Sequence, residues 1–499
     1  MFPLVTSSKP WLLVTVLASA ILCVWWWRSD VGEGSSLPGG VESEDLFRRV
    51  ERSLDVEDLP LDAEGMKALE KLAATDFRVR VLGARVMYRK GFPVKALGEI
   101  ESLLGEEPEN RYGLAAKGRL LWASPSLEDR VAGKVLLREL AAGKDYAALA
   151  ALQALAFGRL GKGAYPDDLL EAARTLRKHP QAGRAVVLRA LEVELALTPP
   201  GDDRDRLFEE AEERFGSARD KAELAGWLVG LKRPDRVLKL VSEKEAASSG
   251  PLFMPCFQAL LETNATAAAR ELLRKATGKL ARMERAKAEA YLGLARKKPD
   301  AVRRFLEAAR TGGTGSNLVE AGRLALLSGD GGLALEAYGE VLERFPNELG
   351  RSEGDQLLQL ALNARDTGLA LNVAKVLARR FPFRWGARNN AVYLGLLSGG
   401  DPEVLEAEAV RILRAAPTNP NFITTLVLAK LLAGKAVEAS ELLDRRGTDR
   451  LLPGERALAV AVSYATGEPA RAALLAKGLV PERMLPEEWY LLERFWKRE

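Results

Sequence analysis

The side chains that most often carry chemistry are scarce in this sequence. There is a single histidine, His179, and there are two cysteines, Cys23 and Cys256. One histidine and two cysteines are too few to complete a tetrahedral zinc site, and the pattern suggests no partner for a catalytic histidine. His179 precedes a proline, and we expect it to end a helix, where the helix dipole favours a cation. We therefore predict no enzyme activity, no metal and no cofactor.

Two glycine-rich stretches have the composition of phosphate-binding loops without their spacing. They are 312-GGTGSN-317 and 158-GRLGKG-163. Neither has the G-x4-G-K-[ST] pattern, and neither follows an expected strand. Glycine is also common wherever the backbone turns sharply between helices. We expect such a turn at both places.

Two basic stretches could bind an anionic partner. Residues 265–310 hold thirteen Lys/Arg and five Asp/Glu, while the whole chain has a net charge of +4. Residues 379–390 interleave arginines with aromatic residues, a mixture that can bind anionic lipid, acidic peptide or nucleic acid. Alternatively, the arginines lie at helix ends while the aromatic residues pack between helices. The candidate partner-binding residues are Arg270, Arg274, Lys275, Arg282, Arg303, Arg304, Arg384 and Arg388.

The elements that position these side chains are expected to be helices. Good helix formers dominate the sequence, which is 47% hydrophobic and 28% charged, as in folded globular proteins. Residues 315–348 show the clearest pattern, with apolar residues at three-and-four spacing on both sides of Gly329–Gly332 and with Phe345-Pro346 at the end. A helix pair this short needs neighbours to bury its apolar face. We therefore predict an all-α protein.

The same spacing recurs along the chain. Residues 77–110 align with the pair above, with Gly91 at Gly329, Ala96 at Ala334, Ile100 at Tyr338 and Pro108 at Pro346. Further turn signals at Gly368, Gly399-Gly400, Gly434 and Gly467 follow Gly329 at separations of 39, 31, 35 and 33 residues. A period of about 34–36 residues gives about thirteen helix-turn-helix units in residues 44–480. Residues 481–499 are expected to form a capping helix, which an open-ended stack needs.

This pattern resembles the tetratricopeptide repeat. Gly322, Gly329, Ala334, Tyr338 and Pro346 carry the match in one pair, and Gly91, Ala96 and Pro108 carry it in the earlier pair. Leu318 replaces the aromatic residue that is usual early in the first helix. The resemblance implies a right-handed superhelical α-solenoid that binds a protein or peptide on its concave surface and has no catalytic activity. The looser repeats in the middle equally fit a degenerate related α-solenoid.

The N-terminus is expected to anchor the chain in a membrane. Residues 11–27 carry no charge, and at about 1.5 Å per residue they span roughly 25 Å. Trp11 and Trp25–Trp27 resemble aromatic belts at the two interfaces. A cleaved signal peptide is the alternative, but apolar residues directly follow Ala18-Ser19-Ala20. We therefore predict an uncleaved transmembrane helix within residues 1–28.

Residues 29–43 are rich in Gly, Ser and Pro and are expected to be a flexible tether. The head before the helix has Lys9 and no acidic residue, which favours its retention in the cytosol. The expected location is therefore the cytoplasmic membrane, crossed once. The body would lie outside the cytosol, in the periplasm if the source is a Gram-negative bacterium, where nucleic acid is not an expected partner.

These features favour a membrane-tethered scaffold whose concave surface binds a protein partner. Such a scaffold could belong to an envelope, secretion or polysaccharide-export assembly. The alternative is a regulatory subunit of a membrane enzyme that recognises an anionic lipid or glycan through residues 265–310. The sequence leaves both functions open.

Overall fold

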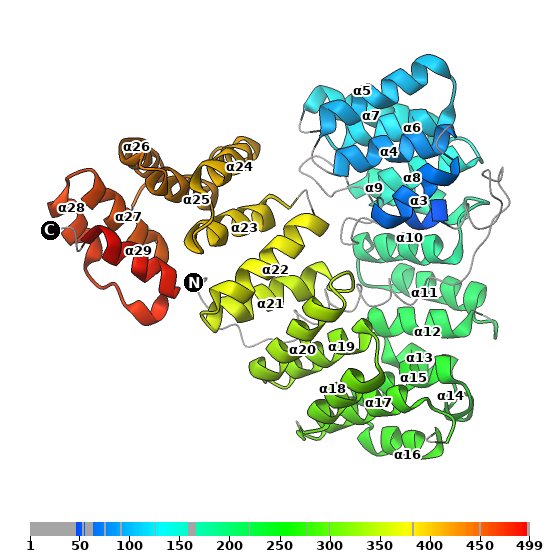
Figure 1. Cartoon of the computed structure of the whole chain (residues 1–499). Coiled ribbons are helices and arrows are strands. Elements are labelled where there is room, and N and C mark those ends of the chain that lie inside the picture. Colours follow the sequence, from blue (N-terminus) through cyan, green and yellow to red (C-terminus); the bar gives the residue numbers. More distant parts are fainter. Residues whose placement is uncertain are drawn as a thin grey trace. The chain divides into compact units, whose positions relative to one another are not determined.

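A computed structural model describes most of the chain beyond its N-terminus (Figure 1). The described residues are 46–51, 54, 63–73, 76–89, 92–124, 126–157, 166–218, 220–276, 278–298, 300–381, 384–448 and 451–496. All regular elements among them are helices, and they include no β-strand, which confirms the predicted all-α class for this part of the chain. The predicted anchor in 1–28 and tether in 29–43 lie outside the described residues. None of the described helices is both long and apolar enough to span a bilayer.

The chain divides into two compact units between residues 298 and 299. The N-terminal unit contains α3 (Ala63–Ala73), α4 (Phe77–Arg89), α5 (Pro93–Glu106), α6 (Arg111–Trp122), α7 (Leu127–Ala141), α8 (Tyr146–Phe157), α9 (Pro166–Lys178), α10 (Arg184–Leu197), α11 (Asp202–Phe215), α12 (Lys221–Gly230), α13 (Pro234–Leu240), α14 (Glu243–Ser248), α15 (Gly250–Glu262), α16 (Thr266–Ala276) and α17 (Arg282–Ala295). The C-terminal unit contains α18 (Asp300–Gly312), α19 (Gly315–Leu327), α20 (Gly331–Arg344), α21 (Arg351–Asn363), α22 (Thr367–Arg380), α23 (Trp385–Leu397), α24 (Pro402–Ala415), α25 (Pro420–Leu432), α26 (Ala436–Arg446), α27 (Pro453–Ala465), α28 (Pro469–Ala476), a short 3-10 helix (Pro481–Arg483) and α29 (Pro486–Trp496). Helices α17 and α18, which follow each other along the chain, belong to different units.

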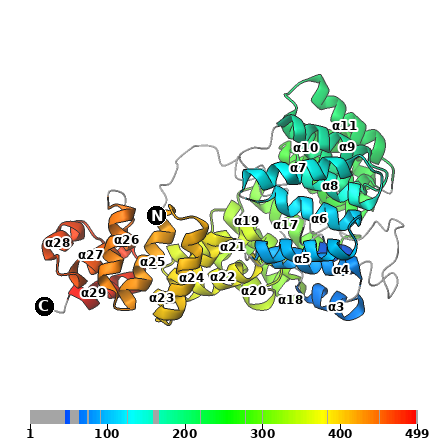
Figure 2. The same cartoon turned by 90° about the horizontal axis from the view of Figure 1, so that it is seen from above.

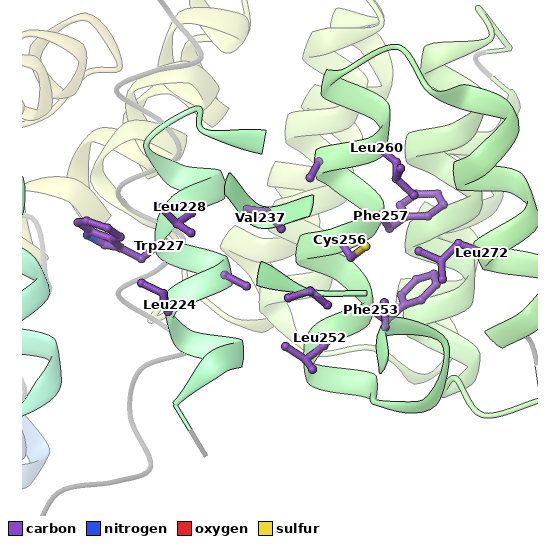
Figure 3. Close-up of a cluster of buried hydrophobic side chains, with 14 of the residues drawn as sticks. Leu224, Trp227, Leu228, Val237, Leu252, Phe253, Cys256, Phe257, Leu260 and Leu272 are labelled. Atoms are coloured by element: carbon purple, nitrogen blue, oxygen red, sulfur yellow. The ribbon is translucent and has the colours of Figure 1, made fainter. Parts of the chain in front are cut away.

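In the N-terminal unit, helices that follow one another along the chain pack together as pairs. The first helices of successive pairs, α4, α6, α8 and α10, also contact one another. A core of large side chains joins α10 to α17 (Figure 3), with Trp227, Phe253 and Phe257 fully buried. Cys256 lies in the same core, where burial raises the pKa of its thiol to about 11. The side chains of this core are therefore almost entirely apolar.

The C-terminal unit repeats this arrangement, and its first helices α23, α25 and α27 contact one another. We call the first helices of its pairs, α19, α21, α23, α25 and α27, the inner layer. The last helix, α29, packs on α27 beside α28 (Figure 2) and also contacts α23. The predicted helix-pair architecture is therefore present in both units, while the right-handed superhelix stays a prediction.

The first helix of each pair from α12 to α27 ends in the same turn. Two residues after each helix ends, the backbone adopts a positive φ, and the next N–H bonds back to a carbonyl in the last helical turn, the Schellman arrangement that satisfies free helix carbonyls. The positive-φ residues are Lys232, Asn264, Lys297, Gly329, Arg365, Gly399, Gly434 and Gly467, at intervals of 32 to 36 residues. The turn signal predicted at Gly368 is wrong, because Arg365 is the turn residue and Gly368 lies in the first turn of α22.

The residues predicted to pack the repeats lie as follows. Gly322 of α19 faces the fully buried ring of Tyr338 in α20, and Ala334 is buried in the same helix. Ala96 and Ile100 are fully buried in α5, whereas Pro108 and Pro346 follow the ends of α5 and α20. Gly91 lies outside the described residues. The close approach of α19 and α20 at Gly322 is therefore the contact to test.

Gly322→Ala should destabilise the C-terminal unit. A Cβ at this position would lie 2.5 Å from the Tyr338 ring, and overpacking of this kind costs about 1–3 kcal/mol. The matched control is Gly339→Ala in α20, where an added Cβ meets nothing within 4 Å and the gain in helix propensity is up to about 1 kcal/mol. Urea unfolding followed by circular dichroism should show a lower midpoint for the first variant only. Equal midpoints would contradict the packing described here.

Candidate functional site

The first basic stretch does not form one patch in the N-terminal unit. Its residues up to 298 lie on α16 and α17 and on the turns at their ends. Lys279 and Arg282 lie at the turn into α17, whereas Lys297 and Lys298 follow its other end. Helix α17 has 14 residues, so at about 1.5 Å per residue its ends are roughly 20 Å apart. The charge that is continuous in sequence is therefore divided into separate groups.

Two of the candidate residues on α16 have acidic partners. Arg274 donates two hydrogen bonds to Glu271, at 2.8 and 2.6 Å, and they lower the pKa of Glu271 to about 2. Lys275 lies 3.7 Å from Glu271 and 3.8 Å from Glu243 of α14. All four side chains are substantially exposed, where such pairs contribute little to stability. Their charges are nonetheless partly neutralised.

The other candidates in this stretch carry free charges. Arg270 and Arg282 in the N-terminal unit are exposed, as are Arg303 and Arg304 on α18 of the C-terminal unit. None of the four forms an ion pair with a residue that the structure describes. Arg310, further along α18, instead binds Glu336 and Glu340 of α20. The four arginines are thus available to an anionic partner, as are the exposed Lys279, Arg296, Lys297 and Lys298 of the same stretch.

The second basic stretch is bound within the C-terminal unit. Arg384 donates two hydrogen bonds to Asp355 of α21, at 2.7 and 2.6 Å. Arg388 bonds to Glu408 of α24, and its guanidinium lies 4.6 Å from the centre of the Trp385 ring. Both arginines therefore join α23 to neighbouring helices, and an external anion would have to compete with these carboxylates.

Arg380 has a different role in the same stretch. It is the last residue of α22, it is buried, and its guanidinium donates to the carbonyl oxygens of Pro346, Asn347 and Leu349. Burial lowers its pKa to about 10. The three carbonyls belong to the segment after α20, where backbone acceptors lack helical donors. Arg380 therefore links the end of α22 to the segment that follows α20.

Hydrogen bonds from an arginine near the end of a second helix to a backbone carbonyl occur at two further places. This contact was not predicted from the sequence. Arg344 at the end of α20 donates to the carbonyl of Arg310, 34 residues earlier, at 3.4 Å. Arg214 near the end of α11 donates to the carbonyl of Arg177, 37 residues earlier, at 3.1 Å. An arginine near the end of a second helix, repeated at about the period of the helix pairs, is the signal that could have revealed it.

An exposed apolar stripe on α7 is a further candidate surface. Leu127, Val131 and Val135 are spaced by four residues and are 69%, 56% and 51% exposed, so they lie along one face of the helix. The opposite face is fixed, because a Cβ at Gly133 would lie 2.5 Å from the backbone nitrogen of Trp122 in α6. A rigid helix thus presents a row of apolar side chains to solvent. Such surfaces commonly mark protein interaction sites.

The residues considered for chemistry have structural surroundings. His179 directly follows α9, as predicted, but burial lowers its pKa and its Nδ1 accepts a hydrogen bond from the Gln181 N–H at 3.2 Å. This burial opposes the cation that the helix dipole is expected to favour. Residues 312–317 run from the end of α18 through the turn at 313–314 into the first turn of α19, whereas 158–163 lie outside the described residues. The described residues include no cluster of His, Cys, Asp and Glu suited to a metal ion.

No protein-family model and no curated protein sequence matches this chain. Three solved structures are similar to it at low identity. The structure of Naa15/Naa10 bound to HypK-THB is 13% identical over 92% of this chain and 73% of that chain, with a TM-score of 0.24. The APC/C hetero-tetramer Cut9-Hcn1 is 13% identical over 92% of both chains, with a TM-score of 0.26. The P58(IPK) TPR domain is 14% identical over 81% of this chain and 99% of that chain, with a TM-score of 0.18. The helix-pair fold described here therefore rests on the contacts within this chain.

Proposed function

We propose that this protein is a scaffold that binds a protein partner. The observation that carries the proposal is the exposed stripe of Leu127, Val131 and Val135 on α7. A helix that was only part of a monomeric stack would place polar residues on its solvent face. The stripe is about 12 Å long at 1.5 Å per residue, so it suits the apolar face of one helix from a partner. The partner-binding surface is therefore the outward face of a second helix, in addition to any concave surface.

The wild-type chain is first used to capture a binding protein from a detergent extract. Leu127→Ser/Val131→Ser/Val135→Ser should then reduce binding of that protein at least tenfold. The matched control is Val404→Ser/Val437→Ser/Leu474→Ser, which changes residues that are 65%, 68% and 66% exposed on the C-terminal unit. Chemical crosslinking and quantitative mass spectrometry would compare recovery of the same protein by the three forms. Equal recovery by all three would refute a role for the α7 stripe.

The proposed scaffold is tethered to the cytoplasmic membrane by the apolar segment 11–27, with its body outside the cytosol. The support for this part is the uncharged run and its flanking tryptophans. The tether in 29–43 would hold the body near the membrane surface. An envelope, secretion or polysaccharide-export assembly is the setting that such an arrangement would serve.

Tethering predicts that the full-length protein stays in the membrane pellet after an alkaline carbonate wash, because a spanning helix is held by the apolar bilayer core. A variant without residues 2–28 should move to the supernatant. Protease added to intact spheroplasts should digest the body if it lies outside the cytosol. Release of the full-length chain by carbonate would rule out the anchor, and protection from protease would reverse the orientation.

A second candidate function is a regulatory subunit that recognises an anionic lipid or glycan. The free charges of Arg270, Arg282, Arg303 and Arg304 favour it, because nearby carboxylates do not neutralise them. Lipid headgroups and acidic glycans share the negative charge that would draw them to these side chains. In this reading the helix pairs hold the arginines in place and the membrane segment holds them near their ligand.

Arg270→Gln/Arg282→Gln should weaken binding to phosphatidylglycerol vesicles at least threefold at low salt, since each surface cation contributes about 1 kcal/mol to such binding. The control, Arg274→Gln/Arg285→Gln, removes arginines that pair with Glu271 and Glu289. Co-sedimentation at rising salt would measure both. Binding that ignores salt, or that falls equally in both variants, would argue against specific recognition by the free arginines.

A further inference from the structure

The C-terminal segment of the chain lies on the inner layer of the C-terminal unit. Helix α29 packs on α27 and contacts α23, which comes about ninety residues earlier. Leu492 is buried against Val460 of α27, and Leu491 is buried in the core shared by α23, α25 and α27. The segment therefore runs across several helix pairs, whereas a cap that only closed the stack would need to contact the last pair alone.

The helix beneath this segment has no exposed face along much of its length. Residues 457–463 of α27, on which α29 packs, are an unbroken run of buried residues, whereas a surface helix normally alternates buried and exposed positions. Helix α21 belongs to the same layer but still exposes Gln359 and Asn363. Helix α29 therefore takes the place on the inner layer where a bound segment would lie.

The first residues of this segment accept hydrogen bonds from side chains that come much earlier in the C-terminal unit. The Arg365 side chain donates from Nε to the Met484 carbonyl oxygen at 2.9 Å, across 119 residues. The Thr367 hydroxyl donates to a carboxylate oxygen of Glu487. These donors lie at the turn between α21 and α22, and they meet acceptors of the segment on its approach to α29.

Glu488 makes the most specific of these contacts. The Tyr393 hydroxyl donates to its Oε1 at 2.7 Å, and the Leu485 N–H donates to its Oε2 at 2.9 Å. A Cβ at position 454 would lie 2.1 Å from Oε1, so Gly454 at the start of α27 makes room for the carboxylate. Burial raises the pKa of Glu488, and its hydrogen bonds counter this effect only in part.

A buried carboxylate is a costly way to close an apolar stack, because the charge must leave water. Such groups are better suited to fixing one register of a helix against its neighbours. Thr367, Tyr393 and Gly454 therefore form a site on the C-terminal unit that fits a helix with acidic residues in its first turn. An apolar surface lies next to this site. Helix α29, with Glu487 and Glu488 in its first turn and leucines after them, fits that site.

We propose that residues 484–496 are an internal ligand, and that the partner of the C-terminal unit is an amphipathic helix with acidic residues in its first turn that displaces them. This proposal rests on the scaffold function above and specifies the kind of segment that is bound. A partner helix would make the same contacts to Thr367 and Tyr393 and would cover the same face of α27. That face of the inner layer is thus closed until such a helix replaces residues 484–496.

The test uses a fluorescein-labelled peptide of residues 484–496 and the full-length protein. Glu487→Gln/Glu488→Gln in the protein should raise its affinity for the peptide at least tenfold, because the weakened internal segment competes less at its high effective concentration. Adding Thr367→Val/Tyr393→Phe to that variant should reverse the gain. Glu482→Gln, which changes an exposed carboxylate before the segment, should leave the affinity at the wild-type level. Fluorescence anisotropy measures all four proteins.

Failure of the double glutamine variant to bind the peptide better, with unchanged circular dichroism and melting, would overturn the proposal. Hydrogen exchange on the wild-type chain gives a second measure that needs no variant. Amides of 489–496 should exchange at least tenfold faster than those of 457–463, because the segment opens while α27 stays folded. Equal exchange would make α29 an inseparable part of the fold. Neither measurement depends on the α7 stripe, so the scaffold function can fail or hold independently.

Discussion

The structure depends on how closely the two helices of a pair can approach. At Gly322 an added Cβ would lie 2.5 Å from the Tyr338 ring, and at Gly354 it would lie 2.5 Å from the Leu377 side chain. A large side chain on the second helix thus fills space that only a glycine on the first leaves open. A pair that is fixed in this way keeps a defined geometry on its outer surfaces. The exposed stripe on α7 and the acidic-turn site on the inner layer both require that rigidity.

The period of the pairs could be predicted from the sequence, but half of its turns could not. Gly329, Gly434 and Gly467 are recognisable because glycine adopts positive φ without strain. The same conformation is held by Lys232, Asn264, Lys297 and Arg365, and three of these residues, two lysines and an arginine, give no hint of it. At those turns the bond back to the end of the first helix compensates for the strained backbone. The sequence therefore predicted a turn at Gly368, the nearest glycine, and the apparent intervals became irregular.

Charge was harder to predict than the helices, because its effect depends on partners that are distant in sequence. Arg380, Arg384 and Arg388 look alike in a basic stretch, yet one caps backbone carbonyls and the others bind Asp355 and Glu408. These partners come from other helices, so only the packed structure identifies them. Arg270 and Arg282 lack such partners among the described residues, and counting charges could not separate them from the rest. A net charge per stretch is therefore a poor guide to an anion site in a repeat protein.

Which surfaces are exposed to a partner depends on which surfaces the chain covers with its own segments. The resemblance to tetratricopeptide repeats pointed to an inner binding surface, and periodicity identified the helices that form it. Neither could show that Met484 would bind Arg365 across 119 residues or that Glu488 would bind Tyr393 across 95, because such contacts leave no periodic trace in the sequence. With α29 in place, α27 is buried along residues 457–463, while α21 and the outer stripe on α7 keep exposed side chains. The unit can therefore hold a partner on this face of α27 only in exchange for its own α29, whereas the α7 stripe is exposed without such an exchange.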